Sequence, residues 1–180
     1  MTFRRLGEEV VYDGHFVKVV KGTFEGPDGG TFEREYNKHK GAVAVVALDG
    51  DEVVLVRQYR AAIDSMLLEI PAGLLDVDGE APEDAALREL EEEVGLRVVG
   101  DLELLIRYTV AAGFSDHYVI IYLARATEAC DHDRQGPEEQ AMTVERVRLT
   151  DVDRLLASGE LTDAKTIIGL LLARDRLLRT

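Results

Sequence analysis

A chain of 180 residues with a formal net charge of −14 suits one domain with a small appendage, leaves no room for a second catalytic domain, and lacks the basic character of a nucleic-acid binder. The single cysteine, Cys130, excludes an internal disulfide. Neither a signal sequence nor an apolar run of roughly 18 residues is present, so we expect a soluble cytoplasmic protein without a membrane or nucleic-acid partner.

The start of the chain predicts a small β-structure. Residues 15–25 and 31–38 alternate enough to be strands, and the Gly- and Pro-containing residues 26–30 between them are typical of a turn. A hairpin of this size is not stable alone. We therefore expect residues 1–40 to form a small N-terminal β-subdomain and residues 41–180 to form the main domain.

The main domain begins with a buried hairpin. Residues 41–48 and 52–56 are almost continuously apolar and flank an Asp-Gly-Asp turn. Further strands are expected over 102–110, 118–125 and 143–149, and helices over 82–94, 151–157 and 163–178. A long polar loop is expected over 128–140. This order predicts an α+β fold with a mixed sheet.

The helix expected over 82–94 carries its own start and stop signals. Pro82 fits the first helical turn, where a missing N–H costs nothing, and Gly95 fits a left-handed C-cap. Turn residues over 71–73 and 78–79 bring the backbone close to the start of the helix. The sequence therefore predicts a loop-helix-loop unit.

One side of this helix is acidic. At about 100° per residue, three carboxylates fall within an arc of about 100°, and these are Glu89, Glu92 and Glu93. Three apolar residues lie on the opposite side, which are Leu87, Leu90 and Val94. Like charges three or four residues apart destabilise a helix, so the stripe is either a solvated face or a site for a cation. Oxygen ligands at this density suit Mg²⁺ or Mn²⁺.

The residues around the helix resemble a known motif. Glu80, then after seven residues Arg88-Glu89-Leu90, Glu92-Glu93 and Gly95-Leu96, are similar to the Nudix box, G-x5-E-x7-R-E-U-x-E-E-x-G-U, of hydrolases that act on nucleoside diphosphate derivatives. Six residues, not five, separate Gly73 from Glu80, and one extra loop residue costs little. The resemblance implies a Nudix α/β/α sandwich with a mixed β-sheet.

Further segments resemble the ADP-ribose pyrophosphatase branch of this family. They are residues 41–46, 58–60, 68–76, 113–116 and 138–143, and the likeness covers about residues 34–172. The branch implies Mg²⁺-dependent hydrolysis of ADP-ribose to AMP and ribose 5-phosphate, and a homodimer in which the N-terminal subdomain helps to build the substrate site. Ala112 and His117 depart from the Pro and Glu that the branch commonly has, and both departures concern the substrate.

The resemblance also implies roles for individual residues. The groups expected to bind Mg²⁺, or Mn²⁺, are the Ala72 carbonyl, Glu89, Glu92 and Glu93. The pair expected to orient the helix and its loop is Glu80 and Arg88. The general base is expected in the polar loop, where Glu138 is the first choice and Glu139 the second, with Glu92 as the next candidate.

Substrate contacts are expected from Arg60, Arg34, Tyr36 and Phe114. Arg60 follows an apolar strand, and its planar guanidinium suits a diphosphate. An ion pair is the alternative for both arginines and is favoured for Arg34. Tyr36 or Phe16 is a candidate to stack on adenine, although aromatic residues in strands are more often core. The same reservation applies to Tyr59 and Phe114, and the histidines His39, His117 and His132 show no zinc-ligand spacing.

Three functions are compatible with this sequence. The first is hydrolysis of ADP-ribose. The second is hydrolysis of another nucleoside diphosphate derivative, such as a different nucleotide-sugar, a dinucleotide polyphosphate or a damaged nucleotide. The third is a non-catalytic nucleotide-sugar sensor. Such sensors usually carry a degraded box and an attached DNA-binding domain, whereas all the box carboxylates are present here.

Overall fold

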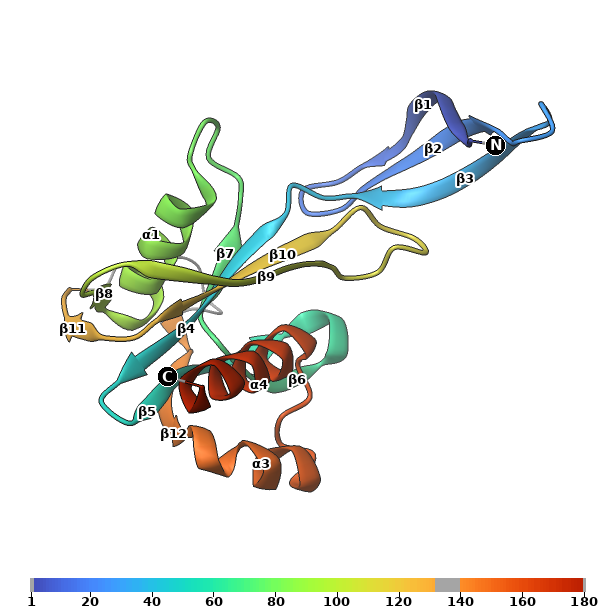
Figure 1. Cartoon of the computed structure of the whole chain (residues 1–180). Coiled ribbons are helices and arrows are strands. Elements are labelled where there is room, and N and C mark those ends of the chain that lie inside the picture. Colours follow the sequence, from blue (N-terminus) through green and yellow to red (C-terminus); the bar gives the residue numbers. More distant parts are fainter. Residues whose placement is uncertain (1, 132–139, 180) are drawn as a thin grey trace. The chain divides into compact units, whose positions relative to one another are not determined.

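The structure, a computed structural model, describes residues 2–131 and 140–179. The chain forms two units. The smaller comprises Met1–Gly41 and Tyr108–Val119, and the larger comprises Ala42–Arg107 and Ile120–Thr180 (Figure 1). The smaller unit thus includes a segment from the middle of the chain, and the role of its N-terminal residues in dimerisation stays a prediction.

Three antiparallel strands form the sheet of the smaller unit, in the order β1 (Arg4–Asp13), β2 (Lys18–Glu25) and β3 (Thr31–Lys38). The hairpin expected from the sequence is confirmed as β2 and β3. Its turn is closed by a hydrogen bond of 2.7 Å from the Gly26 N–H to the Gly30 carbonyl.

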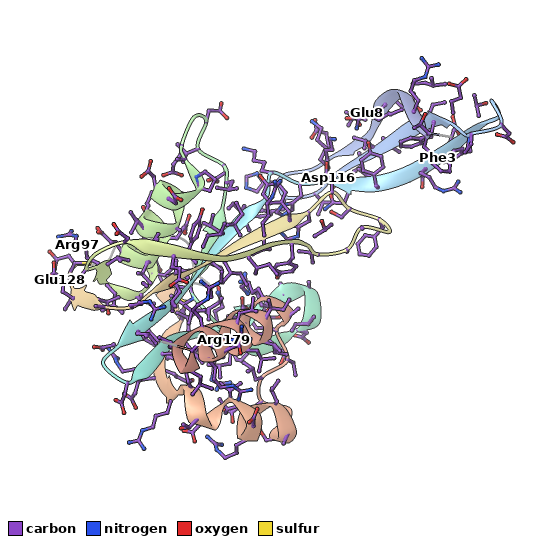
Figure 2. The ribbon with its side chains drawn as sticks, in the orientation of Figure 1. Phe3, Glu8, Arg97, Asp116, Glu128 and Arg179 are labelled. Carbon is purple, nitrogen blue, oxygen red and sulfur yellow. The ribbon has the colours of Figure 1, made fainter. Side chains whose placement is uncertain are left out.

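Strand β1 does not follow from the sequence pattern. Two register shifts, between Arg5 and Gly7 and between Val10 and Tyr12, break its period of two. Every residue of the strand is exposed, so no buried face marks it by alternating apolar residues. Glu8 lies on this strand (Figure 2).

A seven-stranded sheet runs through the larger unit. Its strands are neighbours in the order β12-β5-β4-β10-β9, while β6 pairs with β5 and β7 pairs with β4. Their bounds are β4 (Ala42–Asp49), β5 (Glu52–Arg60), β6 (Ser65–Glu69), β7 (Ala72–Leu74), β9 (Leu102–Thr109), β10 (Tyr118–Ala124) and β12 (Thr143–Arg148). The strands expected from the sequence are confirmed, whereas β6 and β7 are too short to produce a readable period.

A separate pair of short strands consists of β8 (Leu96–Val98) and β11 (Thr127–Ala129). Their antiparallel register places Arg97 opposite Glu128, as Figure 2 shows. Strand β11 therefore occupies the start of the stretch that the sequence predicts to be a polar loop.

The helices are α1 (Pro82–Val94), α3 (Val152–Ser158) and α4 (Ala164–Leu178), with 3₁₀ turns η1 (Ala61–Ile63) and η2 (Leu149–Asp151). Helix α1 begins and ends where the sequence predicts, and Gly95 caps it with a φ of 66°. Across residues 2–131 and 140–179, none of the helices is long and apolar enough to span a membrane.

The core of the larger unit lies around β4 and β5. Residues 43–48 and 53–56 are all buried, as expected for strands covered on both faces. Figure 1 shows α1 on one side of β4 and α4 on the other, and both helices contact this strand. The α/β/α sandwich and the α+β class predicted from the sequence are confirmed.

Candidate active site

The loop between β6 and β7, residues 70–71, and the first residues of β7 are fixed to their surroundings by their backbone. The Pro71 carbonyl accepts a hydrogen bond of 3.0 Å from the Val45 N–H. The Ala72 N–H donates one of 3.0 Å to Oε2 of Glu93, on α1. The next residue is glycine, and a Cβ at Gly73 would lie 1.9 Å from Cδ of Glu89, so any other residue would displace this carboxylate. The loop and α1 are therefore in direct contact through two carboxylates of the acidic helix.

Arg88 joins the carboxylates around it. Its Nε and Nη2 donate to the two carboxylate oxygens of Glu80 at 3.0 and 3.1 Å. Its Nη1 donates to Glu89 at 2.7 Å and to Glu92 at 3.0 Å. The hydrogen bonds with Glu80 raise the pKa of Arg88 far above its usual range, with the charge of Glu89 adding to the rise. Arg88 thus offsets the repulsion among these acids.

The buried side of α1 differs from the expectation at three positions. Leu90 is fully buried as predicted, but Leu87 and Val94 are only half-buried. Glu93, expected on the acidic side, is 3% exposed. The hydrogen bond from the Ala72 N–H explains the difference, because it gives a buried carboxylate a partner.

The carboxylates of α1 suit a divalent cation by their chemistry. Glu89, Glu92 and Glu93 offer hard oxygen donors from one helix, and the missing Cβ of Gly73 leaves room for the Glu89 carboxylate. Within residues 2–131 and 140–179, no group of three or more His, Cys, Asp or Glu side chains is arranged to hold a metal ion. Arg88 binds both Glu89 and Glu92, and the Ala72 N–H binds Glu93.

A second charged cluster lies beside the loop. Arg60 donates through Nε and Nη2 to the two oxygens of Glu69, at 2.6 and 2.7 Å, and Lys165 of α4 also donates to this carboxylate. Glu69 is fully buried. Burial raises the pKa of Glu69, but the hydrogen bonds from Arg60 and the charge of Lys165 outweigh this effect and lower it.

The sequence analysis does not identify this cluster beyond Arg60. Asp163 caps α4 by accepting from the Thr166 N–H at 2.9 Å, and it also binds Lys165 at 3.0 Å. The Thr166 hydroxyl donates to Asp163 at 2.6 Å and accepts from the Ile70 N–H at 2.9 Å. Asp163 is a preferred N-cap residue and can be recognised as one in the sequence, but nothing local in the sequence indicates the partners of this cluster near residue 70.

The other substrate candidates lie in the smaller unit. The Tyr36 hydroxyl donates to Glu8 at 2.5 Å, which lowers the pKa of this carboxyl. Arg34 lies over the ring of Phe32, with 4.9 Å from Cζ to the ring centroid, and its Nη1 donates to the Glu33 carbonyl. Phe114 is 67% exposed. Within the described residues Arg34 makes this contact with an aromatic ring and forms no ion pair, which is the alternative favoured from the sequence.

Phe16, His39 and His117 are further candidates from the sequence that the structure describes. Phe16 is 82% exposed and is therefore not a core residue. His39 and His117 stack with ring centroids 3.6 Å apart, which is not a chelating arrangement. Glu138, Glu139 and His132 lie outside the described residues.

Comparisons with known proteins agree with this geometry. The chain matches the NUDIX domain over residues 38–168. It is 36% identical over 164 residues to the ADP-ribose pyrophosphatase of Bacillus subtilis (strain 168), which covers 91% of this chain and 88% of that protein. It is 36% identical over 170 residues to the ADP-ribose pyrophosphatase of Mycobacterium tuberculosis, which covers 94% and 82%. The crystal structure of an ADP compounds hydrolase aligns with a TM-score of 0.87 at 26% identity, over 99% of this chain and 96% of that one.

The architecture is thus the mixed-sheet Nudix fold. The chain belongs to the Nudix family of hydrolases. Nudix hydrolases generally use a divalent metal ion, which agrees with the oxygen donors on α1.

Proposed function

We propose that this protein hydrolyses the diphosphate link of ADP-ribose, with Mg²⁺, to AMP and ribose 5-phosphate. The observation that carries the proposal is the cluster in which Ala72 and Gly73, at the start of β7, lie against Glu93 and Glu89 of α1. The two relatives named ADP-ribose pyrophosphatase, each 36% identical over most of both chains, support the choice of substrate.

The chemistry of the link explains why carboxylates are needed. A diphosphate is kinetically inert because its anionic oxygens repel a nucleophile, so a catalyst must neutralise charge and hold water in line. A bound Mg²⁺ supplies charge neutralisation and activates water. In our proposal Glu89, Glu92 and Glu93 hold the ion together with the Ala72 carbonyl, and Mn²⁺ is the alternative ion.

We assign Glu80 and Arg88 a supporting role. Their ion pair joins the loop before α1 to the helix itself. Arg88 also binds Glu89 and Glu92, so its guanidinium sets the side-chain positions of two proposed ligands. The pair therefore acts on catalysis through the ligands and not by contact with substrate.

The general base is proposed to be Glu138, in the sequence before β12, because carboxylates that bind a metal ion are poor bases. Glu138→Gln should lower kcat by roughly 10²–10⁴ with little change in KM, the usual range for loss of a general base. Glu139→Gln is the matched control and should do much less. Equal small effects in steady-state kinetics of the two variants would move the base to Glu92.

Substrate binding is proposed for Arg60, Arg34, Tyr36 and Phe114. Arg60 is the best supported, because its side chain is 42% exposed and its guanidinium is fixed by Glu69. A planar guanidinium held in this way suits a diphosphate. The high exposure of Phe114 suits stacking on an adenine ring.

We further propose a homodimer that uses residues 1–40. The support is a set of exposed apolar side chains on β1, which are Leu6, Val10, Val11 and Tyr12. Apolar surface of this kind is typical of an interface between proteins. Cys130 is a free thiol, which suits a reducing, cytoplasmic location.

A substrate panel tests the proposed function. ADP-ribose, another nucleotide-sugar, a dinucleotide polyphosphate and an oxidised nucleotide are each incubated with the protein and Mg²⁺, and products are separated by chromatography. We expect the highest kcat/KM for ADP-ribose, with AMP and ribose 5-phosphate in equal amounts. A higher kcat/KM for another compound would make that compound the substrate in place of ADP-ribose. If no compound is hydrolysed with Mg²⁺ or Mn²⁺, the remaining candidate function is that of a non-catalytic nucleotide-sugar sensor.

A further inference from the structure

The carboxylate of Glu69 is shared by two cations. It is buried between the guanidinium of Arg60 and the ammonium of Lys165, and each donates to it directly. Side chains of Lys165 and Glu69 are 14% and 1% exposed, so solvent screens this pair little. A carboxylate with one cationic partner forms a neutral pair, whereas Glu69 with two partners leaves one net positive charge.

The fourth member of the cluster does not cancel this charge fully. Asp163 binds Lys165, but it also caps α4 through the N–H of Thr166. A carboxylate at a helix N-terminus interacts with the positive end of the helix dipole. The charge of Asp163 is therefore shared between α4 and Lys165.

The positive charge reaches the surface at Arg60. The bonds to Glu69 use Nε and Nη2, on one edge of the guanidinium, and Nη1 makes no hydrogen bond to a residue in the described part of the chain. The hydrogen bonds to Glu69 raise the pKa of Arg60 most, and the charges of Glu69, Glu93 and Asp163 add to the rise. Since Glu93 belongs to the carboxylates of α1, Arg60 lies within electrostatic reach of the proposed catalytic site.

Helix α4 also holds the loop that follows Glu69. The Thr166 hydroxyl accepts from the Ile70 N–H at 2.9 Å. A Cβ on Gly169, one turn further along, would lie 3.1 Å from Cδ1 of Ile70, so the helix and the loop are closely packed. Lys165 thus binds Glu69, the last residue of β6, and Thr166 binds Ile70, the residue that follows it.

We propose that Lys165 is a positioning residue for substrate binding: it offsets the charge of the buried Glu69 carboxylate and so keeps the positive charge of Arg60 available to the diphosphate. This inference rests on the proposed function, because the ligand is the diphosphate of ADP-ribose. Lys165 acts through Arg60 and does not touch the substrate.

The first experiment compares kcat and KM for ADP-ribose in the full-length protein. Lys165→Met should raise KM about tenfold and change kcat less than about threefold, because the lost charge acts on substrate and transition state alike. Lys165→Arg should restore a KM close to that of the wild type. Arg174→Met is the matched control, since it removes one positive charge from the same helix at a residue that pairs with Asp153 of α3, and should change neither constant.

Two double variants test the route through Arg60. Glu69→Gln combined with Lys165→Met removes both charges and should return KM to within about threefold of the wild type. In an Arg60→Gln background, Lys165→Met should have no further effect on KM. Two results would overturn the inference. One is a Glu69→Gln, Lys165→Met variant whose KM is as high as that of Lys165→Met alone, and the other is a tenfold rise in KM on adding Lys165→Met to Arg60→Gln.

Folding is measured separately by circular dichroism, because Lys165→Met leaves a buried carboxylate with one partner fewer. If Lys165→Met does not fold, Glu69→Gln is compared with the variant that carries both Glu69→Gln and Lys165→Met, because neither contains the buried carboxylate charge of Glu69. Glu69→Gln should then have a KM several-fold lower, and equal KM values would contradict the proposal. A wild-type protein that does not hydrolyse ADP-ribose defeats the proposed function, whereas normal hydrolysis with unchanged KM in the Lys165 variants defeats only this inference.

Discussion

The two units of this protein use similar polar residues with different results. In the larger unit, Glu69 and Glu93 are buried, and each has defined hydrogen-bond partners. In the smaller unit, Glu8 is bound by Tyr36 and Lys38 but lies on a strand whose residues are all exposed. Exposed ion pairs are screened by water and contribute little to stability. Burial under helices is therefore what turns a group of charges into a site with fixed geometry.

The largest expected effect comes from the buried carboxylate of Glu93. Glu93→Gln keeps the size of the side chain and an acceptor for the Ala72 N–H, but it removes charge from the proposed metal site. We expect kcat to fall by about 10³ or more, because metal-ion catalysis depends on charge stabilisation. The readout is ADP-ribose turnover at saturating Mg²⁺, with Glu9→Gln on the exposed strand β1 as control. Near-normal turnover of Glu93→Gln would place the site elsewhere.

A smaller effect is expected from the loop glycine. Gly73→Ala introduces a Cβ where the Glu89 carboxylate lies. Displacement of this side chain by about 1 Å should lower kcat roughly 10²-fold. Gly7→Ala is the matched control, because nothing lies within 4 Å of a Cβ at Gly7. If both alanine variants had wild-type kcat, the contact between the loop and α1 would not matter for turnover.

The last prediction concerns the exposed sheet and is measured as a change in molecular mass. Light scattering of the full-length protein should give the mass of a dimer, and Val11→Asp should shift it towards a monomer by placing a charge among the exposed apolar side chains of β1. Glu9→Gln, on the same strand, should leave the mass unchanged. A full-length protein that is monomeric at micromolar concentration would exclude the dimer.

How far the sequence predicts this structure depends on how local the signals are. The limits of α1 follow from Pro82 and Gly95, and the hairpin of β2 and β3 follows from its turn, because these residues act on their own neighbours. Strand β1 is missed because its bulges remove the period of two. The box residues are identified by their spacing alone, and the structure adds which of them Arg88 binds.

Interactions between distant residues are the part that sequence reasoning does not supply. Arg60 is a candidate from its position after an apolar strand, but its partner Glu69 has no local pattern. Lys165 is 96 residues from Glu69 and reads as an ordinary surface lysine. The buried position of Glu93 depends on one backbone N–H, at Ala72, which no helical periodicity can reveal.

The hydrogen bond from Ile70 to Thr166 determines when, during synthesis of the chain, the loop after Glu69 can be held in place. The two residues are 96 positions apart, so the loop beside the box helix has no access to this partner while the first half of the chain is being synthesised. The larger unit acquires its full set of contacts only after the ribosome has released α4. A nascent chain that already contains every residue of the Nudix box therefore still lacks the hydrogen bond between Ile70 and Thr166. Nucleotide hydrolysis should begin only when α4 packs against the sheet.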